Sequence, residues 1–231
     1  MLSLKSVSAG YDGAVINRDV SLEIRDGEIL ALIGRNGVGK TTLAKTVIGL
    51  VRSLSGSIML DGVDVTKQDA RQRARLGIGY VPQGRGIFAD LSVEENLCMG
   101  RLIGQGKAKS VEMAFDLFPI LGERRRQLGG TLSGGQQQML SIARILIGTP
   151  KLLLLDEPAD GIQPNIVENI GDICLQLNRE TGLTILLIEQ NVDLITACAH
   201  RCILMERGEI TKTIPPIDLE DPNTARMALA I

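Results

Sequence analysis

Aromatic residues are scarce in this sequence, which has no tryptophan, two tyrosines and three phenylalanines among its 231 residues. Proteins that bind single-stranded nucleic acids without sequence preference stack the bases on aromatic side chains. The charge also argues against a nucleic-acid partner, because 25 basic and 27 acidic residues give a net charge of −2 and no basic excess. We therefore expect no nucleic acid among the partners.

Long hydrophobic runs are also missing. The apolar runs, such as residues 152–155 and 185–188, have the length of β-strands and are too short to span a bilayer. The first residues lack the basic start and the long apolar segment of a secretion signal. We therefore expect a cytosolic protein, for which any membrane role requires a partner.

Cysteine pairs of the CxxC type are absent, which is typical of a reducing compartment. Cys198, His200 and Cys202 have a spacing that metal ligands can have, but they lie at the end of a mostly apolar helix. Small buried thiols beside an ordinary histidine are the stronger interpretation of this segment.

Apolar segments of strand length alternate with helical patterns along the chain, as is typical of a parallel sheet covered by helices on both faces. The strands predicted for this sheet are residues 28–33, 77–81, 152–155, 184–188 and 201–205. Turn sequences occur at Asp26-Gly27, Asp61-Gly62 and Arg207-Gly208, and the second of these indicates a hairpin. The fold class is therefore α/β.

The middle of the chain has a different pattern. From about residue 91 to residue 147 the apolar positions repeat with helical spacing, and loops are predicted at 104–106 and 128–130. A short helix is also predicted at 68–75. We expect an inserted helical subdomain at about 88–147, within a single domain that covers 1–231.

A phosphate-binding loop connects the first predicted strand of the parallel sheet to the helix that follows. Its residues fit the pattern G-x-x-x-x-G-K-[ST] in the strand–loop–helix context that this pattern requires. The glycines let backbone N–H groups surround phosphate oxygens, and Lys40 would reach the β and γ phosphates while the Thr41 hydroxyl binds Mg²⁺. The predicted nucleotide contacts are Gly34, Arg35, Asn36, Gly37, Val38, Gly39, Lys40, Thr41 and Thr42.

Two adjacent carboxylates, Asp156 and Glu157, end the apolar strand at 152–155. Because consecutive strand residues point to opposite faces, the two acids can have different functions. Asp156 would hold Mg²⁺, directly or through water, and Glu157 would polarise the attacking water. Two solvated acids at a strand end are the alternative, which the phosphate loop makes the weaker interpretation.

A second glycine-rich segment, Leu132 to Gln136, precedes a helix whose apolar face includes Leu140, Ala143 and Ile147. A helix start with free N–H groups can bind an anion, and a plain helix cap is the alternative. Because a small domain needs only one phosphate site for one nucleotide, a second site suggests that the chain works as a pair. The residues concerned are Ser133, Gly134, Gly135 and Gln136.

Taken together, these motifs resemble the ATP-binding subunits of ABC transporters over essentially the whole chain, in the family's order and with family-like spacing. The resemblance implies a P-loop NTPase core with a mostly parallel sheet, an N-terminal antiparallel β subdomain and an inserted α-helical subdomain. It implies ATP and Mg²⁺ as cofactors and ATP hydrolysis coupled to transport. Lys40, Glu157 and Gln190 would be the catalytic residues, and Thr41, Gln83 and Asp156 the metal ligands.

The same resemblance implies a head-to-tail dimer, in which residues 133–136 of one subunit close over the ATP held by the other. Tyr11 matches the aromatic residue that stacks on adenine, with an ordinary surface tyrosine as the alternative. Gln83 would also sense the γ-phosphate. The implied partners are two transmembrane permease subunits, a related ATPase subunit or a second copy of this chain, and indirectly a periplasmic binding protein. The implied location is the cytoplasmic face of the inner membrane.

Two positions depart from the usual pattern of this family. Gln190 stands where most members have a histidine, and Gln163 stands where many have an aspartate that bridges the dimer. Glutamine can hydrogen-bond a phosphate oxygen but carries no charge. His200 lies ten residues further on and is not expected to replace the missing histidine.

These departures resemble one branch of the family, the second ATPase subunit of importers for branched-chain amino acids and for urea and short amides, with the urea type nearest. Soluble ABC-type ATPases that act on nucleic acids or ribosomes, and ATPase subunits of exporters, are the alternatives. The former commonly carry a long coiled-coil insertion, tandem ATPase halves or a basic patch, and the sequence has none of these. The transported molecule depends on partner subunits and cannot be identified from this chain.

Overall fold

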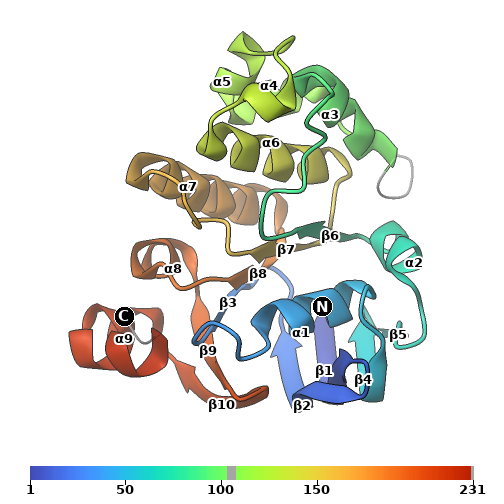
Figure 1. Ribbon diagram of the computed structural model, residues 1–231, viewed down its shortest axis with the longest axis vertical. Helices are drawn as coiled ribbons and strands as arrows, with labels where there is room; N and C mark the ends of the chain where they lie inside the picture. Colours follow the sequence, from blue (N-terminus) through green and yellow to red (C-terminus); the bar gives the residue numbers. More distant parts are fainter. Residues whose placement is uncertain (103–107, 230–231) are drawn as a thin grey trace.

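The computed structural model describes residues 1–102 and 108–229 (Figure 1), so the loop predicted at 104–106 lies outside the described residues. Its strands are β1 Leu2–Tyr11, β2 Ala14–Ile24, β3 Ile29–Ile33, β4 Ser53–Leu60, β5 Val63–Asp64, β6 Ile78–Val81, β7 Leu152–Asp156, β8 Thr184–Ile188, β9 Arg201–Glu206 and β10 Glu209–Ile214. Its α-helices are α1 Lys40–Ile48, α2 Ala70–Arg75, α3 Val93–Met99, α4 Val111–Leu117, α5 Pro119–Glu123, α6 Gly134–Ile147, α7 Pro164–Thr181, α8 Val192–Cys198 and α9 Pro222–Leu229. Short 3₁₀ helices occupy Gly100–Leu102, Gly129–Thr131 and Pro216–Glu220.

The central sheet has the strand order β10-β9-β3-β8-β7-β6, and every neighbouring pair is parallel except β10 with β9. This confirms the mostly parallel sheet predicted from the sequence. All residues of β3, β7 and β8 are buried, because helices or a second sheet cover both faces. The phosphate loop and the acidic pair therefore leave the sheet at the carboxyl ends of neighbouring strands.

The two faces of the sheet pack against different layers. In β7, Leu153 and Leu155 belong to the core formed with α6 and α7, whereas Leu152 and Leu154 belong to the core formed with α1 and the N-terminal strands. This alternation follows from the two-residue period of a strand. Figure 1 shows α6 and α7 on one side of the sheet and α1 on the other.

The N-terminal strands form a separate antiparallel sheet in the order β2-β1-β4-β5. It packs against α1 through a shared apolar core that includes Leu4, Leu22 and Leu43. The structure therefore contains the antiparallel N-terminal β layer that the family resemblance implied. This layer also places the end of β1, with Tyr11, next to the start of α1.

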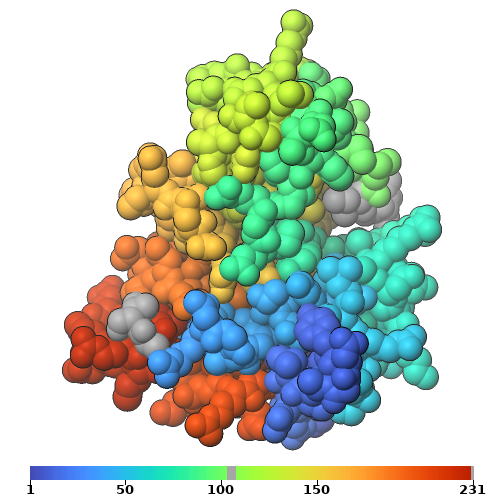
Figure 2. All heavy atoms as spheres, in the orientation of Figure 1, coloured from blue at the N-terminus to red at the C-terminus, as the bar shows by residue number. Residues whose placement is uncertain are grey.

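Helices α3 to α6 lie together at one end of the molecule (Figure 1). Figure 2 shows this part of the chain, in green and yellow-green, as a narrower end above a broader part that contains the blue N-terminal and the orange and red C-terminal segments. The boundaries predicted for a helical subdomain, 88–147, stay a prediction. Within it the pattern is less helical than expected, because residues 124–128 contain turns, and a 3₁₀ turn at Gly129–Thr131 replaces part of the loop predicted at 128–130.

Other local expectations are met within a few residues. Helix α2 begins at Ala70 rather than at residue 68, because the Asp69 side chain accepts the N–H of Gln72 and caps the helix there. Strand β10 follows the turn predicted at Arg207-Gly208 and was not predicted itself. Within residues 1–102 and 108–229, no helix is both long and apolar enough to cross a bilayer.

Candidate functional site

The phosphate loop runs from the end of β3 to the start of α1, and its backbone conformation needs glycine at defined positions. A Cβ on Gly34 would lie 2.4 Å from the carbonyl oxygen of Met205, and one on Gly39 would lie 2.6 Å from the Asn17 side-chain nitrogen. Gly39 is also left-handed, with φ of 108°, and stands immediately before α1. No side chain among the described residues caps this helix, so its first N–H groups can bind an anion.

Lys40 is buried at the start of α1, and its ammonium group lies under the loop. Its Nζ donates hydrogen bonds of 2.7 Å to the carbonyl of Gly34 and 3.0 Å to the carbonyl of Arg35. Burial lowers the pKa of Lys40, while the charges of Glu157, Asp156 and Glu189 act in the opposite direction. The structure thus places the Lys40 ammonium beside the Glu157 carboxylate at the predicted phosphate site.

Asp156, at the end of β7, is fully buried and accepts two side-chain hydrogen bonds. Thr41 Oγ1 donates to its Oδ1 at 3.0 Å, and the Tyr80 hydroxyl donates to its Oδ2 at 2.9 Å. Burial raises the pKa of Asp156 against the effect of these two bonds, and it also raises the pKa of Tyr80. A hydroxyl and a carboxylate are oxygen ligands of the kind that Mg²⁺ prefers, so Thr41 and Asp156 fit this ion.

Glu157 turns away from the strand, with φ of 52°, and has partners different from those of Asp156. Gln83 Nε2 donates a 2.6 Å hydrogen bond to its Oε2, and Lys40 Nζ lies 3.9 Å from its Oε1. In this structure the Gln83 amide therefore contacts Glu157, and the prediction that Gln83 binds Mg²⁺ stays a prediction. The two adjacent acids occupy separate environments, as their positions in the sequence suggested.

Gln190 follows β8 and bridges two of the predicted site residues. Its side-chain amide donates to Asn36 Oδ1 and, at 3.4 Å, to Glu157 Oε1. His200 lies elsewhere, because its Nδ1 accepts the N–H of Ile29 at the amino end of β3, whereas the phosphate loop leaves the carboxyl end. Among the described residues, no three His, Cys, Asp or Glu side chains are placed to hold a metal ion together, so Cys198, His200 and Cys202 do not form such a site.

A cavity of about 250 Å³ opens above the phosphate loop and joins residues distant in the sequence. Tyr11, with 44% of its surface exposed, stands at this cavity. None of the residues 133–136 belongs to its lining. The lining residues are Tyr11, Ile16, Gly37, Gly39, Lys40, Thr41, Thr42 and Glu157.

Ser133 caps α6, which is the alternative that the sequence left open to a helix start with free N–H groups. The Gln136 N–H donates to Ser133 Oγ at 3.4 Å, and the Ser133 N–H donates to Gln136 Oε1 at 3.0 Å. A Cβ on Gly135 would lie 2.2 Å from Ile166, so this glycine allows α6 to approach α7 closely. The cap is formed within the chain, and the expected contact with a partner's ATP stays a prediction.

The segment after β6, residues 82–86, is attached to α6. Arg85 Nη1 donates to Gln137 Oε1 at 3.0 Å, and Arg144 Nη2 donates to the Gly86 carbonyl at 2.7 Å. The Ser141 hydroxyl also donates to the Arg85 carbonyl. Gln83 belongs to this segment, so its position depends on the helix that Ser133 begins.

Two residues of the site, Tyr80 and Glu189, were not predicted from the sequence. Glu189 is 3% exposed and accepts three backbone hydrogen bonds directly after β8. A carboxylate immediately after an apolar strand was the signal used for Asp156 and Glu157, and it would have identified Glu189 as well. Tyr80 lies within β6, and no pattern in the sequence indicated that its hydroxyl would reach Asp156.

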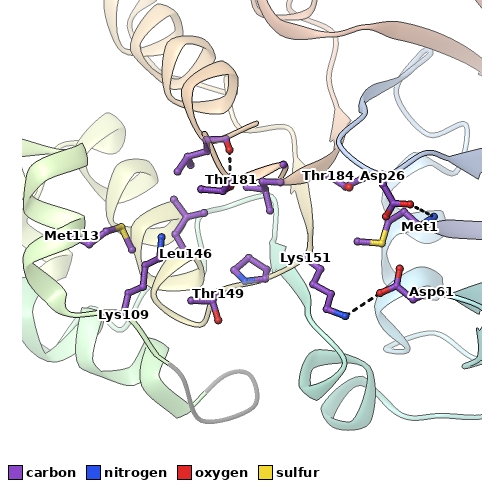
Figure 3. Close-up of a pocket in the computed structure, with 14 residues that line it drawn as sticks. Met1, Asp26, Asp61, Lys109, Met113, Leu146, Thr149, Lys151, Thr181 and Thr184 are labelled. Carbon is purple, nitrogen blue, oxygen red and sulfur yellow. Dashed lines mark hydrogen bonds and ion pairs between the residues drawn. The ribbon is translucent and has the colours of Figure 1, made fainter. Parts of the chain in front are cut away.

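A second cavity, of about 440 Å³, lies at the amino ends of β7 and β8 (Figure 3). Its wall includes Met113 and Leu146 from the helices, and the ion pair between Lys151 and Asp61 at 3.1 Å stands at its edge. None of the predicted site residues lines it. It lies away from the phosphate loop, which leaves the opposite end of the sheet.

Comparison with known proteins gives a consistent result. A family model described as ABC transporter matches residues 17–160. The high-affinity branched-chain amino acid transport ATP-binding protein BraG of Pseudomonas aeruginosa is 44% identical over 91% of both chains. The lipopolysaccharide export system ATP-binding protein LptB of Escherichia coli is 36% identical, covering 99% of this chain and 96% of LptB. The crystal structure of the ADP conformation of MJ1267, an ATP-binding cassette of an ABC transporter, has a TM-score of 0.84 at 25% identity and covers 98% of this chain and 97% of its own.

Proposed function

Because this chain belongs to the ABC transporter family and is an ATP-hydrolysing subunit, we propose that it energises an importer of branched-chain amino acids, or of urea or short amides. The observation that carries this proposal is the 44% identity with BraG over 91% of both chains. Gln190, which departs from the usual histidine, supports the same branch. The membrane-bound partners, which are absent from this chain, would select the transported molecule.

The phosphate loop would hold the triphosphate of ATP. The N–H groups at the start of α1 and the Lys40 ammonium are the available donors, and the 250 Å³ cavity leads from them to Tyr11. On nucleotide binding, Lys40 would exchange its contacts with the Gly34 and Arg35 carbonyls for phosphate oxygens. Tyr11 would stack on the adenine.

Thr41 and Asp156 would hold Mg²⁺ with the help of Gln83. The 3.0 Å hydrogen bond between Thr41 and Asp156 supports this assignment, because it brings two oxygen ligands together at the loop. When bound, the ion would neutralise charge on the β and γ phosphates. The Tyr80 hydroxyl would keep the Asp156 carboxylate in one orientation.

Glu157 would orient the attacking water, and Gln190 would contact the γ-phosphate. Glu157 fits this function because its carboxylate is held by Gln83 and faces Lys40, which would contact the phosphates. Gln190 reaches both Asn36 of the loop and Glu157, so it lies between the phosphate loop and the proposed general base. Catalysis would consist of positioning and electrostatic stabilisation.

A partner subunit would complete each site. The capped start of α6 at Ser133 lies outside the lining of its own chain's cavity, which supports a contact with the ATP of another subunit. That subunit would be a related ATPase or a second copy, and Gln163 would lie at the contact. Two permease subunits would then place the assembly at the cytoplasmic face of the membrane.

Uptake of labelled leucine, urea and acetamide by a strain lacking this subunit tests the importer assignment. We expect loss of uptake of one substrate class, restored by the wild-type gene and by a Glu168→Gln control but not by Glu157→Gln. Unchanged uptake of all three would contradict the importer branch. The purified chain should still hydrolyse ATP in that case.

An exporter ATPase is the second candidate, favoured by the 36% identity with LptB over 99% of this chain. In that case deletion would leave uptake intact, and the substrate would accumulate inside the cell. Co-purification with a membrane protein is expected for either transporter. Recovery with nucleic acid or ribosomes would instead favour the soluble ATPase alternative.

A further inference from the structure

Glu189 has the most hydrogen-bonded carboxylate in the site. It directly follows β8, with 3% of its surface exposed. Its Oε1 accepts the N–H of Ala159 at 2.8 Å, and its Oε2 accepts the N–H groups of Gln190 at 2.6 Å and Asn191 at 2.8 Å. Burial raises the pKa of Glu189 against the effect of these three bonds.

The three donors belong to two different segments. Ala159 lies two residues after Glu157, in the segment that leads through Gln163 to α7. Gln190 and Asn191 lie in the turn between β8 and α8, and the Asn191 side chain caps α8 by accepting the N–H of Leu194. One carboxylate therefore joins the segment after the proposed general base to the turn that carries Gln190.

We propose that Glu189 is a positioning residue for hydrolysis, which holds the segment after Glu157 and the turn bearing Gln190 in one fixed arrangement. This inference rests on the proposed roles of Glu157 and Gln190. Because β7 and β8 are neighbours, a short side chain from the end of β8 can reach the segment that follows β7. Movement of the segment that carries Gln163 would then also move Gln190.

An ionised carboxylate suits this position because it only accepts hydrogen bonds, and all three of its partners are donors. In Glu189→Gln, the amide oxygen can still accept from Gln190 and Asn191. The amide nitrogen would then face the Ala159 N–H, donor against donor. This substitution should therefore break the bond to Ala159 and keep the turn at Gln190.

The test compares purified Glu189→Gln with the wild type and with Glu168→Gln, a matched change at an exposed glutamate of α7. We expect kcat for ATP hydrolysis to fall about 10- to 100-fold, because a small misplacement of catalytic groups slows a reaction by about this factor. The Kd for ATP should stay within about twofold, since Lys40 and the phosphate loop keep their contacts. Hydrogen exchange should accelerate at 158–163 more than at 190–195, which a general loss of stability would not produce.

Unchanged kcat, or unchanged exchange at 158–163 in the variant, would overturn the proposal. If Glu189→Gln does not fold, exchange in the wild type decides, because the amide of Ala159 should be protected as well as those of Gln190 and Asn191. An unprotected Ala159 would overturn the proposal. Absence of ATPase activity from the wild type would instead contradict the proposed function, and the exchange measurement does not depend on that activity.

Discussion

The Gln83 side chain donates a 2.6 Å hydrogen bond to the Glu157 carboxylate. The two residues follow β6 and β7, which are parallel neighbours in the sheet, and so they meet at its carboxyl edge. Glu157 has Lys40 and Gln190 on its other oxygen. The proposed base is therefore oriented by three polar side chains from three different segments.

Glu157→Gln tests the proposed base. The amide cannot take a proton from water, so we expect ATP hydrolysis to fall on the order of 100-fold or more. ATP binding should be retained, because the phosphate loop is unchanged, and ATP-dependent dimers should accumulate in size-exclusion chromatography. Glu168→Gln, at an exposed position of α7, is the control. Normal turnover in Glu157→Gln would remove Glu157 from this role.

Lys40→Ala should weaken nucleotide binding. Hydrogen bonds to charged groups contribute about 1.5–3 kcal/mol, so affinity should fall about 10- to 100-fold in a titration with a fluorescent ATP analogue. Because Lys40 also binds the Gly34 and Arg35 carbonyls, thermal unfolding of the variant is measured in parallel. Lys5→Ala, at an exposed position of β1, should bind as the wild type does. Equal affinity of the Lys40 variant would contradict the assignment.

Gln190→His should introduce a pH dependence that the wild type lacks. Glutamine does not titrate, whereas histidine has an ordinary pKa of about 6.5. We expect kcat of the variant to change between about pH 5.5 and 7.5 relative to the wild type. Gln190→Ala should reduce kcat without adding the dependence. Identical pH profiles for all three proteins would show that position 190 does not contact the reacting phosphate.

Gly34→Ala and Gly37→Ala form a matched pair within the phosphate loop. Both positions have positive φ, but a Cβ on Gly34 meets the Met205 carbonyl at 2.4 Å, and one on Gly37 meets nothing within 4 Å. Gly37→Ala should cost only backbone strain, about 1–2 kcal/mol. Gly34→Ala should lower the free energy of unfolding by a larger amount in chemical denaturation, because β9 must also shift. A larger loss for Gly37→Ala would refute this comparison.

Glu28 should make the protein sensitive to acid. Burial alone would raise the pKa of Glu28, but the hydrogen bond from Arg201 at 2.8 Å and the Arg25 N–H hold it below its usual value of 4.5. A lowered folded-state pKa means that the unfolded chain binds the proton more readily. The stabilisation is therefore complete above the unfolded value and is lost as pH falls through the folded pKa.

Urea unfolding of the wild type and Glu28→Gln at pH 7 and at pH 4 and below measures this effect. At pH 7 the variant should be less stable by about 1 kcal/mol or more, and the difference should shrink in acid. Glu209→Gln, an exposed change in β10, should leave the pH dependence unaltered. A constant difference between wild type and Glu28→Gln at all pH values would contradict the linkage.

Within the central sheet, the sequence predicted the strands that are buried on both faces and missed the exposed edge strand β10. Continuous apolar runs identify β3, β7 and β8, because helices or a sheet cover both of their sides. Strand β10, Glu209–Ile214, is the antiparallel edge of the sheet, and none of its residues is buried. Its Thr and Lys residues have no periodic apolar signal, so only pairing with β9 makes it a strand.

In the candidate site as well, some residues could be predicted from the sequence and others could not. Gly34 to Thr41 could be predicted because phosphate binding imposes residue types at fixed spacing. The contacts of Tyr80 and Glu189 could not, since they depend on β6, β7 and β8 being neighbours in this order. Spacing along the chain does not encode which strands are adjacent.

The hydrogen bonds that attach residues 82–86 to α6 have a mechanical consequence. A displacement of this segment moves Gln83, which meets the Glu157 of its own subunit, together with the helix that starts at Ser133. In the proposed dimer, Ser133 faces the neighbour's nucleotide. A single displacement of residues 82–86 by a membrane subunit would then change the surroundings of two nucleotides at once. The two ATP sites would respond together without any other coupling between them.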